Sequence, residues 1–290
     1  MDVVLALVAA LFFALGTVLQ QRAGLEAPVE GGSSGLLLRM AKRPVWLAGI
    51  AADGIGFIAQ AVALGIGRLA VVQPLLVSSV VFALPLGARL SGQRIRRVDI
   101  GGAVLVVGAL VAFLTIAEPS GGRDDAPLNE WLVAGGICLA LCVPLFLLGR
   151  TGPPSRRAAM LGVATGILFA LSAALTKVVV DELDDGVFEI FLSWHLYALV
   201  VIGYASMTFN QLALNTGALA PAVATSLAFD PITSVILGVT LLQESLHTTP
   251  AQLVGTVIAL AAALAGMAVL ARSQSEAQSV QEPVSAPATA

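Results

Sequence analysis

The chain has 290 residues, of which 58% are hydrophobic and only 11% are charged, and its formal net charge is −3. Soluble domains carry about 25% charged residues, so this composition excludes a water-soluble globule and requires lipid to cover much of the surface. The lack of a basic, aromatic-rich stretch argues against nucleic-acid binding. The sequence therefore indicates an all-α integral membrane protein.

Apolar stretches long enough to cross a bilayer recur along the whole chain. A spanning helix needs about 20 mainly apolar residues, and clusters of Gly, Pro and Ser separate the stretches. Asp2 stands where a signal peptide would carry positive charge, so the first stretch is taken as a membrane span. Nine spans are predicted, at residues 2–21, 44–65, 69–90, 98–117, 130–149, 158–180, 190–214, 219–242 and 251–271.

Lysine and arginine are distributed unevenly between alternate connections. With the N-terminus outside, twelve of these residues fall on the cytoplasmic side and three on the outer side, a strong positive-inside bias. We therefore expect a multi-pass protein of the cell membrane with the N-terminus outside and the C-terminus cytoplasmic. The twelve are Arg22, Arg39, Lys42, Arg43, Arg89, Arg94, Arg96, Arg97, Arg150, Arg156, Arg157 and Arg272, and the three are Arg68, Arg123 and Lys177.

The connections expected outside are acidic. Their charges are either ordinary solvated loop residues or an electrostatic funnel that attracts cations. The acidic residues concerned are Asp124, Asp125, Asp181, Glu182, Asp184, Asp185 and Glu189.

The two halves of the chain resemble each other. The segment FALGTVL at 13–19 matches FALSAAL at 169–175, and ALGIGRLA at 63–70 matches ALNTGALA at 213–220. One helix between two four-helix units turns the second unit upside down, so we predict nine helices in a 4+1+4 inverted repeat, as in many secondary transporters. The predicted units are the first repeat at 1–121, the linker helix with its loops at 122–157, the second repeat at 158–272 and a disordered cytoplasmic tail at 273–290.

Three short motifs carry a resemblance to a known family: VQPL at 72–75, QLALNTG at 211–217 and LQES at 242–245. With these motifs and its duplication, nearly the whole chain resembles the drug/metabolite transporter superfamily with EamA-like units. Within that superfamily it is most similar to the NIPA-like magnesium transporters. This resemblance implies nine helices, an outer N-terminus and transport of a small solute or a divalent cation such as magnesium.

The chain departs from the family pattern at two positions. The NIPA-like pattern has an acidic residue in the second helix where this chain has Phe57, and the acid here is Asp53, one turn earlier. Gln93 stands where the superfamily often has Glu. Both departures affect polar positions, so the resemblance does not by itself identify the cargo.

Two carboxylates inside predicted spans are the strongest functional signal. Asp53 and Asp230 lie near the middle of the second and eighth spans, where each costs about 3 kcal/mol on insertion scales. Such residues either serve transport or are protonated and hydrogen-bonded to a neighbouring helix, and intramembrane amides often only bridge helices. Pro231 frees a backbone carbonyl beside Asp230. The candidate substrate- or ion-binding residues are Asp230, Asp53, Ser226, Thr233, Ser234, Gln60, Asn210, Gln211 and Gln73.

No enzymatic motif is recognised in the chain, and no cofactor is expected. Cys138 and Cys142 share one helix face without further ligands, and we interpret them as packing residues. His195 and His247 form no paired-histidine motif. We therefore predict a secondary transporter that is not an enzyme and contacts the lipid bilayer and a small solute or cation. A specific magnesium transporter and a non-transporting membrane scaffold are the alternatives, and metal ligands and oligomeric state stay open at this point.

Overall fold

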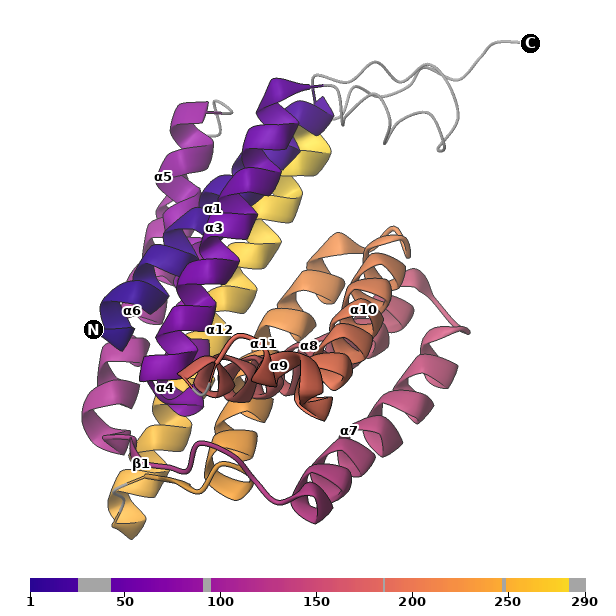
Figure 1. Ribbon diagram of the computed structural model, residues 1–290. Helices are drawn as coiled ribbons and strands as arrows, with labels where there is room; N and C mark the ends of the chain where they lie inside the picture. The colour runs from indigo at the N-terminus through magenta and orange to yellow at the C-terminus, as the bar shows by residue number, and fades with distance from the viewer. Residues whose placement is uncertain (26–42, 91–94, 185, 247–248, 282–290) are drawn as a thin grey trace.

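The computed structural model describes residues 1–25, 43–90, 95–184, 186–246 and 249–281 (Figure 1). Predicted features at Arg39, Lys42, Gln93, Arg94, Asp185 and His247 lie outside these residues. The elements are α1 (Asp2–Leu25), α3 (Pro44–Ile66), α4 (Leu69–Leu76), α5 (Ser79–Leu90), α6 (Arg97–Ala117), β1 (Ser120–Gly121), α7 (Leu128–Gly149), α8 (Pro154–Asp181), η1 (Glu182–Asp184), α9 (Glu189–Leu192), α10 (Trp194–Leu214), α11 (Leu219–Thr240), β2 (Glu244–Ser245) and α12 (Pro250–Gln281).

The prediction of an all-α membrane protein is confirmed. Among the described residues, nine helical segments are long and apolar enough to cross a membrane, with α4 and α5 together forming the third. Their ends lie within a few residues of the predicted ends for most spans, because the long apolar runs and their Gly- and Pro-rich connections are both visible in the sequence.

The third span was predicted as one helix, but it is interrupted in the middle. The backbone N–H of Val77 donates to the Pro74 carbonyl at 3.3 Å, and that of Ser78 donates to the Leu75 carbonyl at 3.0 Å. These bonds reach three residues back, which is the tighter 3₁₀ spacing. Pro74 cannot donate a helical hydrogen bond, and the Ser78 hydroxyl also binds the Leu75 carbonyl at 2.6 Å. The predicted span at 69–90 is therefore confirmed as one span, Leu69–Leu90, with a local break at Val77 and Ser78 that the prediction did not include.

The start of the seventh span also differs from the prediction. A helix was expected from residue 190, but α10 begins at Trp194, after the separate short helix α9. The Ser193 hydroxyl accepts the backbone N–H of His195 at 3.1 Å, which is the usual helix-capping bond. Serine therefore restarts the helix inside an otherwise apolar stretch.

The last helix is longer than expected. The tail at 273–290 was predicted to be disordered, but α12 continues to Gln281. The Ser273 hydroxyl binds the Asp99 carboxylate, and the Arg96 guanidinium donates to the Ser273 carbonyl at 2.9 Å. These contacts anchor the helix to the start of α6, and the Gln, Glu and Ala residues that follow favour continuation.

Helix α8 lies at the centre of the molecule, in contact with α3, α4, α7, α10 and α11. It is the most deeply buried of the nine spans, whereas α7 packs chiefly along α8 and exposes most of its apolar side chains. Helix α1 packs against α3, and α6 packs against α12 (Figure 1). The pair α6 and α12 is antiparallel, since Asp99 contacts Ser273 at one end and Gly255 faces Ile116 at the other.

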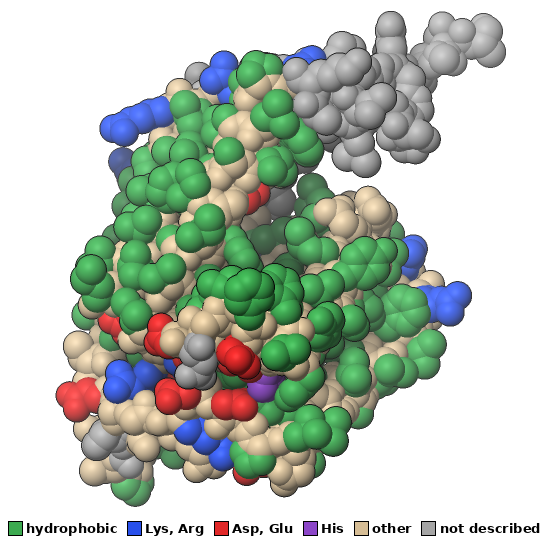
Figure 2. Space-filling model, in the orientation of Figure 1, with side chains coloured by type: hydrophobic (Ala, Val, Ile, Leu, Met, Phe, Trp, Pro, Cys, Tyr) green, Lys and Arg blue, Asp and Glu red, His purple; other side chains and the backbone are tan. Residues whose placement is uncertain are grey.

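Two short strands mark one end of the helices. β1 and β2 pair antiparallel, with Gly121 opposite Glu244, and so join the α6–α7 connection to the α11–α12 connection. We call this end the strand end and the opposite end the far end. Acidic side chains gather at the strand end, and the surface is hollowed between the α1–α3 side and the α8–α10 side toward the far end (Figure 2).

Candidate functional site

The carboxylate of Asp53 is held by the neighbouring helix α1. The Gln20 side-chain amide donates to this carboxylate. Gly16 provides the space for it, because a Cβ atom at position 16 would overlap the Asp53 carboxylate. Asp53 is therefore a fixed polar contact between α1 and α3, and its partner Gln20 comes from one turn beyond Gly16.

Asp230 lies differently, on α11 beside α8. Gly162 and Gly166 of α8 allow the backbone of α11 to approach closely, and a Cβ atom at Gly166 would lie 2.8 Å from the Asp230 nitrogen and 2.6 Å from the Ser226 carbonyl oxygen. The carboxylate itself accepts a hydrogen bond from Ser234 on its own helix at 3.3 Å. Asp230 is partly buried, and its carboxylate is held only by this long intrahelical bond among the contacts identified for it.

The other predicted site residues are scattered among four helices. Ser226 and Ser234 are buried on α11, and Thr233 is partly buried there. Gln73 on α4 is 2% exposed, and its amide nitrogen lacks a hydrogen-bond partner among the described residues. Partly buried Gln60 and Asn210, and exposed Gln211, complete the predicted set.

The structure therefore joins only part of this set. Asp230 and Ser234 are in contact, with Ser226 on the same helix. Asp53 is paired instead with Gln20 of α1, which is not among the predicted site residues. Among the described residues, no identified hydrogen bond or ion pair joins Asp53 to Asp230, and no three His, Cys, Asp or Glu side chains are grouped to hold a metal ion.

A buried carboxylate at the strand end connects distant parts of the chain. Glu244 of β2 is 2% exposed, and its two carboxylate oxygens accept the backbone N–H groups of Leu69 at 2.6 Å and Ala70 at 2.9 Å. These N–H groups belong to the first turn of α4, where helical donors need an outside partner. Burial raises the pKa of Glu244, while the two amides and the charges of Lys177 and Arg68 act in the opposite direction.

A buried lysine lies beside the same corner. Lys177 of α8 is 8% exposed, and its ammonium donates to the Leu64 carbonyl in the last turn of α3 at 3.1 Å. The ammonium also pairs with Asp181 at 3.3 Å. At the α3–α4 corner, the cation Lys177 therefore binds the C-terminal end of α3, and the acidic Glu244 binds the N-terminal end of α4. Both arrangements are favourable for the helix dipoles.

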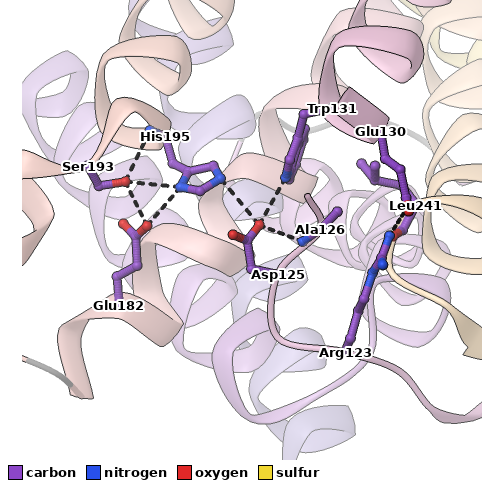
Figure 3. Close-up of polar contacts among 9 residues, drawn as sticks. All are labelled: Arg123, Asp125, Ala126, Glu130, Trp131, Glu182, Ser193, His195 and Leu241. Atoms are coloured by element: carbon purple, nitrogen blue, oxygen red, sulfur yellow. Dashed lines mark hydrogen bonds and ion pairs between the residues drawn. The ribbon is translucent and has the colours of Figure 1, made fainter. Parts of the chain in front are cut away.

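His195 forms a second network at the strand end (Figure 3). Its Nδ1 lies 2.7 Å from Glu182 and its Nε2 lies 3.2 Å from Asp125. The Asp125 carboxylate also accepts the Trp131 indole N–H at 2.9 Å. The network ties the α6–α7 connection, the end of α8 and the start of α10 together, and we interpret it as structural.

Arg123 completes the strand-end contacts (Figure 3). Its guanidinium donates to the Leu241 carbonyl at 2.7 Å and binds the Glu130 carboxylate. Arg68 likewise donates to the Gly121 carbonyl at 3.2 Å. The cations expected outside, Arg68, Arg123 and Lys177, all lie at the strand end and all bind helix-end or strand carbonyls.

Sequence reasoning missed the role of the α3–α4 corner. Glu244 was noticed only through the family motif, and Lys177 only as one charge of the outer connections. A stronger signal was present, because Lys177 is a cation near the end of a long apolar run, where an unpaired charge is costly. The partners could not be predicted, since Glu244 and Leu69 are 175 residues apart.

The nine apolar helices found among the described residues indicate a multi-span helical membrane protein. The chain is 32% identical over 273 residues to the uncharacterized protein Cgl0250/cg0304 of Corynebacterium glutamicum, which covers 93% of this chain and 94% of that protein. The chain belongs to the same family as this corynebacterial protein. No family model matches the chain, and no solved structure matches it.

Proposed function

We propose that the protein is a secondary transporter of the drug/metabolite transporter type, which moves a small solute or cation across the cell membrane by alternating access. Its two four-helix units would be inverted relative to each other, with α7 as the linker helix. The strand end would face outward and the C-terminus would be cytoplasmic, since most of the described lysines and arginines lie at the far end.

The observation that carries this proposal is the position of Asp230 inside the membrane span α11. A carboxylate in the middle of a membrane span costs about 3 kcal/mol, and a side chain kept at that cost needs a function or a strong partner. Asp230 has only Ser234 at 3.3 Å as its identified hydrogen-bond partner. Pro231 follows directly and leaves the Leu227 carbonyl without its helical donor, so a carboxylate and a free carbonyl lie together. These ligands suit a cation or a proton.

The packing of the helices supports the same proposal. The pair α1 and α3 has a counterpart in α8 and α10, and α6 lies antiparallel to α12. Inverted halves can exchange inward-open and outward-open states of similar energy. The surface is hollowed toward the far end, and Glu244 and Lys177 hold the helices together at the strand end. This arrangement fits a state that is open toward the far end.

The test uses proteoliposomes that contain the full chain and a magnesium-sensitive dye. Mg²⁺ is the first probe because of the family resemblance, and simple organic cations follow as a second panel. We expect protein-dependent entry that Asp230→Asn abolishes, whereas Glu189→Gln, which changes an exposed acid at the strand end, leaves it intact. Entry no faster than in empty liposomes for either panel would favour a non-transporting scaffold.

A further inference from the structure

We infer that Glu244 and Lys177 form a latch that keeps the strand end of the transport path shut, and that release of this latch opens that end. The inference rests on the alternating-access function proposed above. The switching contact is then the α3–α4 corner. Two segments of the later half of the chain bind it, namely α8 through Lys177 and the α11–α12 connection through Glu244.

The first half of the latch is a carboxylate on a helix start. Both oxygens of Glu244 are used, one by the Leu69 amide at 2.6 Å and the other by the Ala70 amide at 2.9 Å. Gly238 of α11 makes room for this carboxylate, because a Cβ atom there would press against it. The contact therefore needs α4 and α11 at close approach and cannot survive their separation.

The second half is the ammonium of Lys177 on the Leu64 carbonyl, 3.1 Å apart. Gly65 beside it faces α8 so closely that a Cβ atom would lie 2.5 Å from a methyl group of Val180. Leu64 and Leu69 are both 0% exposed. Apolar packing thus covers the corner, and the two side chains that bind its backbone groups fix its position.

The corresponding corner of the later half is less covered in the part of the chain that the structure describes. The α10–α11 corner matches the α3–α4 corner in sequence, yet Leu219, the counterpart of Leu69, is 43% exposed. The Thr216 hydroxyl at this corner donates to the Ala213 carbonyl at 2.7 Å and accepts the Ala218 backbone N–H at 3.4 Å, and both partners lie within three residues of it. One corner is held by side chains from distant segments while Leu219 at its counterpart is 43% exposed, and such an asymmetry is expected of a single state in an alternating cycle.

Thiol labelling can follow both corners at once, without any cargo. In a background with Cys138→Ala and Cys142→Ala, Val72→Cys reports on the corner under the latch and Leu219→Cys reports on the other. Val72 is 0% exposed. The full-length protein would be held in lipid nanodiscs, and the rate of reaction with a water-soluble maleimide measured for each reporter.

We expect Glu244→Ala to raise the labelling rate of Val72→Cys about tenfold and to lower that of Leu219→Cys, since the two corners open in alternation. Lys177→Met, which keeps the apolar stem, should act in the same direction. The control Glu189→Gln should change neither rate.

A rise at both reporters would mean that the variants loosen the fold, and no change at either would mean that the corner is not held by these groups. Each outcome overturns the latch. Because labelling needs no transport, failure of the latch and failure of the proposed transport in proteoliposomes are separate results.

Discussion

The two intramembrane carboxylates meet glycines on neighbouring helices in different ways. At the α1–α3 contact, the side chain of Asp53 itself occupies the space left by Gly16, and Gln20 binds it. At the α8–α11 contact, Gly166 meets the backbone of Asp230 instead, and the carboxylate stays with Ser234 on its own helix. A glycine faces the acid-bearing helix in both contacts. The Asp53 carboxylate is bound by the neighbouring helix, whereas the Asp230 carboxylate is bound only within its own helix among the contacts identified.

The difference indicates a division of roles. A carboxylate fixed by a neighbouring helix cannot exchange ligands without separating two helices, so Asp53 is suited to hold α1 and α3 together. Asp230 can rotate or change its partner while the α8–α11 packing stays intact. We therefore expect cargo or proton exchange at Asp230 and structural support at Asp53.

The largest effect should follow a change at the α8–α11 contact. Gly166→Ala places a Cβ atom against backbone atoms of Ser226 and Asp230, which cannot move without shifting the helix, and overpacking of this kind costs about 1–3 kcal/mol. Thermal unfolding in detergent should show a clearly lowered midpoint.

The matched control for that variant is Gly203→Ala. Its Cβ atom would meet only the Ser172 hydroxyl, at 3.9 Å, which is an ordinary contact. Alanine also has a helix propensity up to about 1 kcal/mol better than glycine, so the midpoint should stay the same or rise. Equal losses in both variants would contradict the argument from close packing.

The sequence was sufficient for the helices because their signal is local. The span predicted at 44–65 is observed at Pro44–Ile66, and Asp53 and Asp230 lie inside α3 and α11 as the sequence predicts. Their surroundings depend on contacts between distant segments. Nothing near Gln20 in the sequence indicates that its amide binds Asp53, 33 residues later. The break after Leu76 arises because Pro74 lacks a backbone donor and the Ser78 hydroxyl binds the Leu75 carbonyl.

The second effect concerns transport and tests the division of roles directly. If Asp230 exchanges cargo and Asp53 holds helices, Asp230→Asn should reduce Mg²⁺ entry into proteoliposomes at least about tenfold, a loss of about 1.4 kcal/mol. Asp53→Asn should reduce it no more than about twofold, because Asn can still accept the Gln20 hydrogen bond. A larger loss of Mg²⁺ entry in Asp53→Asn than in Asp230→Asn would mean that Asp53 exchanges cargo and Asp230 holds helices.

A smaller effect is expected from Gly16→Ala. The new Cβ atom would displace the Asp53 carboxylate, but a flexible side chain can yield more easily than a backbone. The unfolding free energy should fall by about 1 kcal/mol relative to Gly54→Ala, whose Cβ atom would meet nothing within 4 Å. Chemical denaturation of the two variants in the same detergent measures this difference. A Gly16→Ala protein as stable as the Gly54→Ala control would show that Asp53 is not locked against α1.

The smallest effect is a pH dependence at the strand end. There the Glu244 carboxylate is bound by another helix, as Asp53 is. Burial raises the pKa of Glu244, against the lowering influence of the two amides, Lys177 and Arg68. The closed corner therefore binds a proton more tightly than a state in which Glu244 faces water. Closure is favoured most below the ordinary pKa and weakens as pH rises through the raised value.

Acidification from above the raised pKa of Glu244 toward its ordinary pKa should accordingly slow Val72→Cys labelling, measured as the ratio to the same reporter in Glu244→Ala. The ratio cancels the titration of the reporter thiol itself, which has the same position in both proteins. A ratio that rises on acidification would mean that the carboxylate form is the one that closes the corner, and that the amides of Leu69 and Ala70 outweigh the cost of burial.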